Sequence, residues 1–215
     1  MLRYTVRYNY TFDTISNSSS CTELAALLAS LSRFWRFLTL AFFIFFLVFM
    51  KLSDLTVRAR RIRLVLTDCD GVLTDGGVYY SERGEEMKRF NIRDGMGVER
   101  LRHHGVATGI MTGELSPSVR TRAAKLKIEE LHLGIKDKPA CLHEILARTG
   151  LTAEEVAFIG DDTNDVEILS LVGLSACPGD ATSFARAVAD FHCKTPGGHG
   201  CFRELAEFII AAQTQ

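Results

Sequence analysis

Two aspartates stand one residue apart, Asp68 and Asp70, directly after the apolar residues 62–67. In an open α/β sheet, ligands bind at the carboxyl ends of the strands, and Gly71 lets the backbone turn sharply at this point. Such a carboxylate pair suits an aspartate nucleophile with an acid/base partner. Asp and Gly also favour turns, so a turn that merely closes a strand is an equal alternative for this stretch taken alone.

Polar residues follow three other apolar stretches in the same way. Residues 106–111, 128–133 and 156–160 each have the pattern of a short buried strand. The groups that follow them suit phosphate or metal chemistry: Thr112, Gly113, Glu114, Lys138, Asp161, Asp162 and Asp165. Taken singly, each group could end a strand, cap a helix or lie in solvent. Their joint occurrence at successive strand ends favours one site.

The residue types in this set indicate a reaction. A carboxylate nucleophile, a hydroxyl, an ammonium and an acidic cluster together suit phosphoryl transfer through a covalent aspartyl-phosphate on Asp68. Converging carboxylates repel one another unless a cation lies between them, and oxygen-only ligands favour Mg²⁺. The metal would neutralise phosphate charge as the anionic nucleophile approaches. Thr112, the backbone N–H of Gly113 and Lys138 suit the phosphate oxygens.

The candidate site residues must be positioned by the strands and helices around them. In the predicted secondary structure, strands and helices alternate along the chain. This rhythm predicts an α/β fold, with a parallel sheet covered by helices on both faces. Residues 77–80 and 87–91 flank a Gly-containing turn at 81–86 and predict a β-hairpin. Asp94 is expected to cap the helix that follows. The predicted strands are 62–67, 106–111, 128–133, 156–160, 174–177 and 190–193, and the predicted helices are 94–104, 116–127, 138–149, 165–171, 181–189 and 202–212.

Composition narrows the classes of partner. The 215 residues carry a net charge of −1, so no basic face indicates nucleic acid and a small molecule is the expected partner. Six cysteines without paired spacing are typical of reduced thiols, which predicts a cytoplasmic protein. Cys193 and Cys201, with His192 and His199 nearby, lack the spacing of a zinc site.

Residues 1–50 differ from the rest and are expected to lie outside the domain at 51–215. The apolar run 37–50 is shorter than the roughly 20 residues that span a bilayer. Residues 31–51 could still anchor the chain if Arg33 and Arg36 reach the membrane surface. A secretory signal fits less well, because the run lies far from the N-terminus. Alternatively, translation begins at Met50, and the anchor and this later start remain equal alternatives.

Four segments resemble the motifs of the haloacid dehalogenase superfamily of phosphohydrolases. They are Asp68-x-Asp70, Thr112-Gly113, Lys138 and Gly160-Asp161-Asp162-x-x-Asp165. The resemblance implies a Rossmann-like doubly wound domain in which Asp68 is phosphorylated, while Asp70 protonates the leaving alcohol and then activates water. It also implies Mg²⁺ held by Asp68, the backbone carbonyl of Asp70 and Asp161. Asp162 and Asp165 would orient water and Lys138 around that centre.

The short segments between these motifs leave no room for a cap domain, so the hairpin is expected to protrude beside an open site. This architecture resembles the 3-deoxy-octulosonate 8-phosphate phosphatases. The matching segments are 70–76, 90–97 and 197–200, the last followed by Arg203-Glu204. Members of that group are homotetramers in which hairpins like residues 78–91 meet, and the resemblance implies the same assembly here.

Two signals disagree about the sugar. Glu114 stands where octulosonate enzymes commonly carry Arg, and Glu114 with Lys125 resembles the nine-carbon nononate type, whereas Arg93-Asp94-Gly95 resembles the octulosonate type. Arg93, Lys125 and Arg203 suit a sugar-acid carboxylate, with solvated charges as an equal alternative.

The predicted function is Mg²⁺-dependent hydrolysis of 3-deoxy-D-manno-octulosonate 8-phosphate. A nine-carbon ulosonate 9-phosphate phosphatase is the first alternative, and a catalytically silent partner subunit of a cytidylyltransferase is the second.

Overall fold

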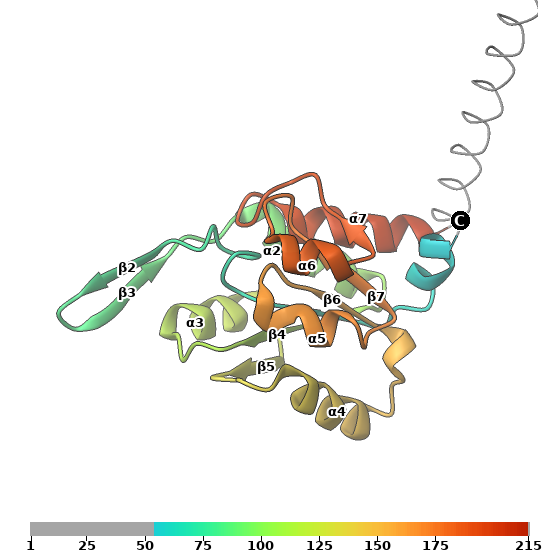
Figure 1. The fold of residues 1–215 in the computed structure, drawn as a ribbon, viewed down its shortest axis with the longest axis horizontal. Coiled ribbons are helices and arrows are strands. Elements are labelled where there is room, and N and C mark those ends of the chain that lie inside the picture. The colour runs from blue at the N-terminus through green and yellow to red at the C-terminus, as the bar shows by residue number, and fades with distance from the viewer. Residues whose placement is uncertain (1–53, 215) are drawn as a thin grey trace, which may run out of the picture. The chain divides into compact units, whose positions relative to one another are not determined.

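A six-stranded parallel sheet forms the centre of the computed structural model, which describes residues 54–214. Its strand order is β5-β4-β1-β6-β7-β8, and Figure 1 labels strands β5, β4, β6 and β7 of this sheet. The central strand β1 (Leu64–Thr67) pairs with β4 (Ala107–Thr112) and β6 (Val156–Ile159). The outer strands are β5 (Glu130–Leu133), β7 (Leu174–Cys177) and β8 (Phe191–His192). Because all these pairings are parallel, the carboxyl ends of the strands share one edge of the sheet.

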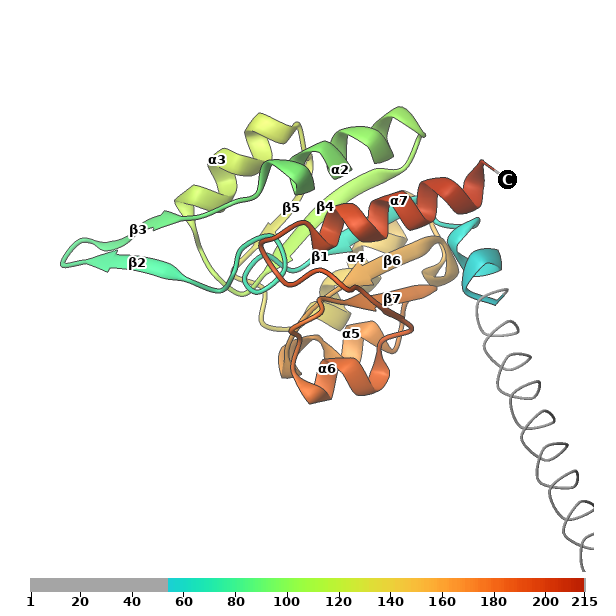
Figure 2. The same cartoon turned by 90° about the horizontal axis from the view of Figure 1, so that it is seen from above.

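Helices cover both faces of the sheet, as Figure 2 shows. In β1, the side chain of Val65 packs into one apolar cluster, and those of Leu64 and Leu66 pack into the other, as alternation along a strand requires. The first cluster includes buried residues of α2 (Ile92–His103), α3 (Pro117–Leu126) and α7 (Cys201–Gln213). The second includes residues of α4 (Lys138–Thr149), α5 (Val166–Leu169) and α6 (Ser183–Val188). The predicted doubly wound fold is confirmed.

Short elements complete the described part of the chain. Residues 54–59 are helical, and the 3-10 turns η1 (Ala153–Glu155) and η2 (Thr163–Asp165) flank β6. The predicted bounds 138–149 and 174–177 match α4 and β7, and those of the other predicted strands and helices outside the hairpin differ from the observed ones by at most two residues at either end. Within residues 54–214, no helix is both long enough and apolar enough to cross a bilayer. The predicted anchor at residues 31–51 lies outside the described residues.

The hairpin protrudes from the domain but its turn is tighter than predicted (Figure 1). Strands β2 (Val78–Ser81) and β3 (Gly84–Lys88) pair antiparallel, with Ser81 opposite Gly84. The turn is therefore Glu82-Arg83 rather than residues 81–86, because Gly84 adopts a φ of +105° that allows the chain to reverse quickly. No cap domain lies between Asp70 and Gly113 in this part of the structure.

The start of α2 corrects the predicted cap. Asn91, not Asp94, is the N-cap, and its side chain accepts a hydrogen bond from the backbone N of Arg93 at 2.9 Å. Asp94 is buried in the first turn and accepts from the backbone N of Arg203 at 3.0 Å, which joins α2 to the start of α7. Burial raises the pKa of Asp94 to about 6. Either residue type can cap a helix, so the packing of α7 decided between them.

Candidate active site

A cleft of about 290 Å³ opens at the carboxyl edge of the sheet. Asp68 and Asp70 reach it directly after β1, Thr112 at the end of β4, and Asp161 directly after β6. The structure thus brings together residues from three neighbouring strand ends. The residues that line the cleft are Asp68, Asp70, Gly71, Gly76, Thr112, Gly113, Glu114, Asp161, Asp162 and Asn164.

Asp68 is held rigidly at the base of this cleft. Its residue is 5 % exposed, and its backbone N donates to the carbonyl of Ile159 at 2.9 Å. Its Oδ1 accepts from the backbone N of Cys69 at 2.7 Å, and its Oδ2 lies 3.1 Å from Lys138 Nζ. Burial raises the pKa of Asp68 to about 6, and the charge of Lys138 acts in the opposite direction. A fixed carboxylate beside an ammonium is suited to attack on an electrophile.

Lys138 lies beneath the cleft as the first residue of α4. Its side chain is 2 % exposed, and Nζ donates to Asp165 as well as facing Asp68. Burial acts to lower the pKa of Lys138, but the two carboxylates outweigh it and hold the pKa above its usual value. Asp137 caps α4 by accepting from the backbone N of Ala140 at 2.8 Å, which fixes the helix start. Lys138 is therefore a permanent, enclosed positive charge.

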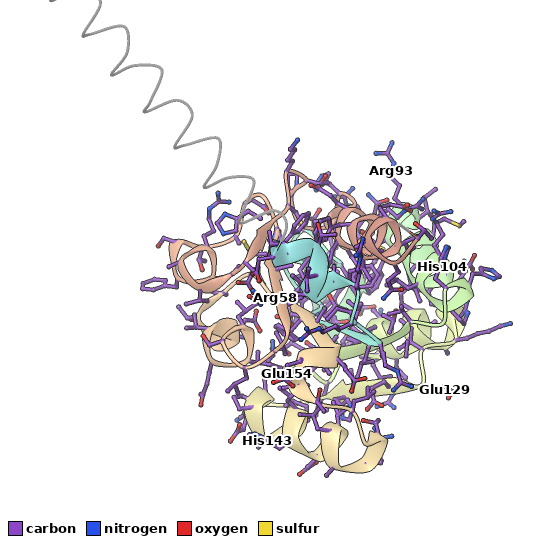
Figure 3. All side chains as sticks on the ribbon, turned by 90° about the vertical axis from the view of Figure 1, so that its right-hand side faces the viewer. Arg58, Arg93, His104, Glu129, His143 and Glu154 are labelled. Carbon is purple, nitrogen blue, oxygen red and sulfur yellow. The ribbon has the colours of Figure 1, made fainter. Side chains whose placement is uncertain are left out.

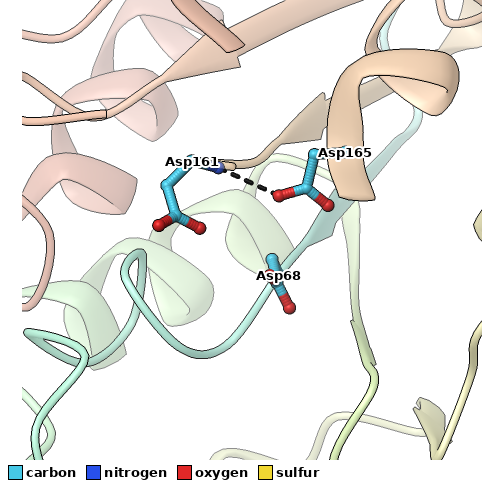
Figure 4. A group of neighbouring side chains, drawn as sticks. All are labelled: Asp68, Asp161 and Asp165. Atoms are coloured by element: carbon cyan, nitrogen blue, oxygen red, sulfur yellow. Dashed lines mark hydrogen bonds between the residues drawn. The ribbon is translucent and has the colours of Figure 1, made fainter. Parts of the chain in front are cut away.

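Three carboxylates, those of Asp68, Asp161 and Asp165, converge at the cleft, as Figure 4 shows. Oxygens of Asp68, Asp161 and Asp165 all lie within 4.8 Å of one another. Burial and then the neighbouring charges of Asp68 and Asp165 raise the pKa of Asp161 to about 7. A cation would relieve this repulsion, and an oxygen-only donor set suits Mg²⁺. The residues present therefore fit the predicted metal.

Asp165 differs from the other two members because its oxygens already have partners. Oδ1 accepts from Lys138, and Oδ2 accepts from the backbone N of Asp161 at 3.0 Å and of Asp162 at 3.4 Å. Asp162 caps η2 by accepting from the backbone N of Thr163 at 2.7 Å. These contacts suit the supporting role that the sequence predicts for Asp165, with Asp161 free to face the cleft.

Two glycines make the close packing of these loops possible. Gly71 has a φ of +81°, and a Cβ on it would stand 2.0 Å from Asp161 Oδ2. A Cβ on Gly160 would stand 2.5 Å from Asp165 Cγ. Any side chain at either position would displace a carboxylate of the site.

Asp70 stands apart from the group of three carboxylates. Its Oδ2 accepts from Lys88 Nζ at 2.5 Å, and its Oδ1 accepts from Thr74 Oγ1 at 3.1 Å. The Asp70 side chain is therefore not part of the group of converging carboxylates. That the backbone carbonyl of Asp70 binds the metal stays a prediction. Sequence reasoning missed Lys88, because a lysine inside a protruding hairpin has the pattern of a solvated charge.

The loop after β4 closes another side of the cleft. Thr112 is buried, and its Oγ1 accepts from the backbone N of Glu114 at 3.3 Å. Gly113 and Glu114 are exposed and line the cleft.

The three cations that sequence reasoning assigned to the substrate do not line this cleft. Arg93 extends outward from α2 in Figure 3, and Lys125 lines a separate groove with Phe90 and Arg122. Arg203 Nε donates to Glu207 Oε1 at 2.5 Å. Their role toward a sugar-acid carboxylate stays a prediction.

The cysteines in residues 54–214 are free and buried. Cys69 is fully buried in the core, as alternation along the strand predicts. The Sγ of Cys193 donates to the carbonyl of Cys201 at 3.5 Å, and neither residue belongs to the metal-suited group.

The comparisons with known proteins identify the class of enzyme to which this α/β domain belongs, with Asp68 and Lys138 enclosed at the carboxyl edge of its sheet. A family model described as haloacid dehalogenase-like hydrolase matches residues 96–205. The chain belongs to this family.

Its relatives point to one activity. The chain is 39% identical over 161 residues to the 3-deoxy-D-manno-octulosonate 8-phosphate phosphatase of Yersinia pestis. The aligned residues cover 75% of this chain and 86% of the relative. It is 36% identical over 156 residues to the enzyme of the same name from Haemophilus influenzae, covering 73% and 87%.

A solved structure carries the same name. The 3-deoxy-D-manno-octulosonate 8-phosphate phosphatase of Moraxella catarrhalis, in complex with magnesium, phosphate and a KDO molecule, superimposes with a TM-score of 0.73 at 33% identity, covering 75% of this chain and 93% of that one.

Proposed function

We propose that this chain is a Mg²⁺-dependent phosphatase that hydrolyses 3-deoxy-D-manno-octulosonate 8-phosphate to the free sugar acid and phosphate. The observation that carries the proposal is the buried Asp68 carboxylate, which faces the cleft between Lys138 and Asp161. The relatives named above support the substrate, because each is named as a phosphatase of this phosphate ester and is 33% to 39% identical to this chain over the aligned residues.

Asp68 and Asp70 divide the chemistry. An oxygen of Asp68 attacks phosphorus, the bond from phosphorus to the sugar oxygen breaks, and Asp70 gives that oxygen a proton. In the second step, water loses a proton to Asp70 and attacks phosphorus. The bond to Asp68 then breaks, which releases phosphate and restores both carboxyl groups.

The remaining groups bind and orient the phosphate. Thr112, the backbone N–H of Gly113 and Lys138 hold its oxygens. Asp68, Asp161 and the backbone carbonyl of Asp70 would hold Mg²⁺, which supplies positive charge that neutralises the phosphate. Asp165 and Asp162 fix the loop and Lys138 through the hydrogen bonds described above.

Mg²⁺ is expected to raise the melting temperature, and to raise it more at pH 8 than at pH 5.5. The pKa of Asp68 is raised to about 6 and that of Asp161 to about 7, so these two groups bind protons more tightly in the folded protein than in the unfolded chain. Their contribution to the stability of the metal-free protein is therefore lost as pH rises from about 4 to 7. The metal competes with these protons and stabilises by mass action.

Thermal unfolding with and without millimolar MgCl₂ at both pH values measures the effect. Asp161→Asn should lose most of the shift, while Asp54→Asn, at an exposed side chain, should keep it. An equal shift at both pH values would contradict the assignment of these carboxylates to the metal.

The substrate is tested by phosphate release. Octulosonate 8-phosphate is expected to give the higher kcat/KM, compared with a nine-carbon ulosonate 9-phosphate in the same assay. Glu114 lines the cleft and favours the nine-carbon alternative, since octulosonate enzymes commonly carry Arg there. Faster release from the nine-carbon ester would therefore replace the octulosonate assignment. Silence toward both, and toward simple esters, would favour the silent partner subunit.

The homotetramer is also part of the proposal. The hairpin exposes Tyr79, Tyr80 and Met87, at 59%, 68% and 55%, and such apolar exposure suits an interface between subunits. Light scattering of the purified protein measures the mass, and a monomer at micromolar concentration would contradict the assembly. The cytoplasmic location and the N-terminal anchor stay predictions.

A further inference from the structure

Lys88 is a buried cation on an otherwise exposed hairpin. Its side chain is 1% exposed, whereas its neighbour Met87 is 55% exposed. Nζ lies 2.5 Å from Asp70 Oδ2 and 3.6 Å from Glu85 Oε2. A buried ammonium persists only where carboxylates compensate it, and Asp70 and Glu85 supply two carboxylates beside Lys88.

Both oxygens of the Asp70 carboxylate accept a hydrogen bond from a side chain. Lys88 donates to Oδ2, and Thr74 Oγ1 donates to Oδ1 at 3.1 Å. Rotation of the carboxylate would break both hydrogen bonds. Asp70 is thereby held apart from the converging oxygens of Asp68, Asp161 and Asp165.

Lys88 is linked through Glu85 to a second element, the start of α3. Glu85, the second partner of Lys88, also accepts from Ser116 Oγ, and Ser116 caps α3 directly after the loop of Thr112 and Gly113. A continuous series of polar contacts thus joins Asp70 through the hairpin to Ser116 at the start of α3. It parallels the arrangement beneath the cleft, where Lys138 lies between Asp68 and Asp165.

We propose that Lys88 is a positioning residue, whose ammonium holds the Asp70 carboxylate in the orientation from which it exchanges a proton with the leaving oxygen and with water. This inference rests on the proposed function. The proposed role of Lys88 predicts different effects on the two steps of the reaction, formation of the aspartyl-phosphate and its hydrolysis. Attack of Asp68 on an ester whose leaving group needs no proton does not require Asp70, whereas hydrolysis of the aspartyl-phosphate does, since water must lose a proton.

Lys88→Met removes the charge and keeps most of the side-chain length. With p-nitrophenyl phosphate and Mg²⁺ in stopped flow, the variant should release close to one equivalent of nitrophenolate in a burst. The steady rate that follows should be about 10²-fold below wild type, the usual contribution of a positioned acid/base group. KM should fall by the same factor, so that kcat/KM stays near the wild-type value, because slow hydrolysis of the aspartyl-phosphate lowers kcat and KM together. Lys127→Met, at an exposed lysine on the C-cap of α3, is the matched control and should keep the wild-type time course.

Two outcomes overturn the proposal: a steady rate equal to wild type, or a folded variant in which burst and steady rate fall together, as a purely structural role would give. If circular dichroism shows Lys88→Met unfolded, Lys88→Arg decides. It keeps the charge with altered geometry and should slow the steady phase about tenfold with the burst intact, and an unchanged steady rate would overturn the proposal.

Wild-type controls keep the two proposals distinguishable. Wild-type turnover of p-nitrophenyl phosphate without turnover of octulosonate 8-phosphate would reject only the proposed substrate, and the Lys88 comparison would still be read. A wild-type protein that hydrolyses neither ester would reject phosphatase activity itself, and with it the acid/base role that Lys88 serves.

Discussion

Asp68→Asn is expected to abolish phosphate release, with kcat lowered about 10⁴-fold or more, because the neutral amide cannot form the covalent phosphoryl intermediate. The substitution preserves shape, and the amide oxygen can still accept from the backbone N of Cys69, as Asp68 Oδ1 does at 2.7 Å. It also removes one negative charge from the group that Asp161 and Asp165 share. The amide NH₂ would face Lys138 in place of Oδ2, but Lys138 keeps Asp165 as its partner, so the loss of activity should come with only a small change in stability.

Phosphate release and thermal unfolding, measured on the same preparation, check both parts. Asp54→Asn makes the same chemical change at a side chain that is 66% exposed, and it should leave turnover at the wild-type value. Undiminished turnover by Asp68→Asn would exclude this residue as the nucleophile. A large fall in melting temperature would show that the carboxylate is needed for folding instead.

Lys138→Met is expected to lower the free energy of unfolding by about 3–5 kcal/mol, the usual cost of removing one partner from a buried ion pair. The side chain of Lys138 is 2% exposed, and those of its partners Asp68 and Asp165 are 7% and 0% exposed. Without the ammonium, both carboxylates stay buried with no compensating cation. Turnover should also fall about 10²-fold or more, because a charge that stabilises the phosphate oxygens is lost.

The destabilisation should depend on pH with a definite sign. Lys138 remains charged across pH 5 to 8, because its pKa is raised above the usual value. The dependence therefore comes from the carboxyl groups. The pKa of Asp68, about 6 with the lysine present, should rise further without it, so protonation at lower pH relieves the unpaired charge.

Urea unfolding at pH 5 and pH 8 measures this difference, and the variant should lose more stability at pH 8. Lys136→Met, at an exposed lysine of the same loop, is the matched control and should be neutral. A loss that is equal at both pH values would mean that Lys138 stabilises by packing rather than by charge.

The sequence by itself determined the fold class and the residues that meet at the centre of the candidate site. Alternating strand and helix patterns require parallel strands joined by crossovers, and these bring the carboxyl ends of all strands to one edge. Residues that directly follow β1, β4 and β6 must then meet there, whatever the details of packing. For this reason Asp68, Thr112 and Asp161 could be placed together from their spacing alone, and the cleft does contain them.

Only the tertiary structure shows the side-chain contacts between elements that are distant in the chain. The repeating pattern of a strand or helix does not predict such contacts. Lys88 and Asp70 meet across 18 residues of chain, and Asp94 meets the start of α7 across 109. Neither contact has a sequence signal, because a charged residue looks the same in a pattern whether it is solvated or enclosed.

Packing also decided the surroundings of the cations that the sequence analysis had grouped by charge. Arg93, Lys125 and Arg203 are not among the residues that line the cleft, because the direction of a side chain on a helix depends on which face of the helix is buried. The sequence thus determined which chemical groups gather at the sheet edge. The docking of the hairpin and of α7 decided which further groups hold them in place.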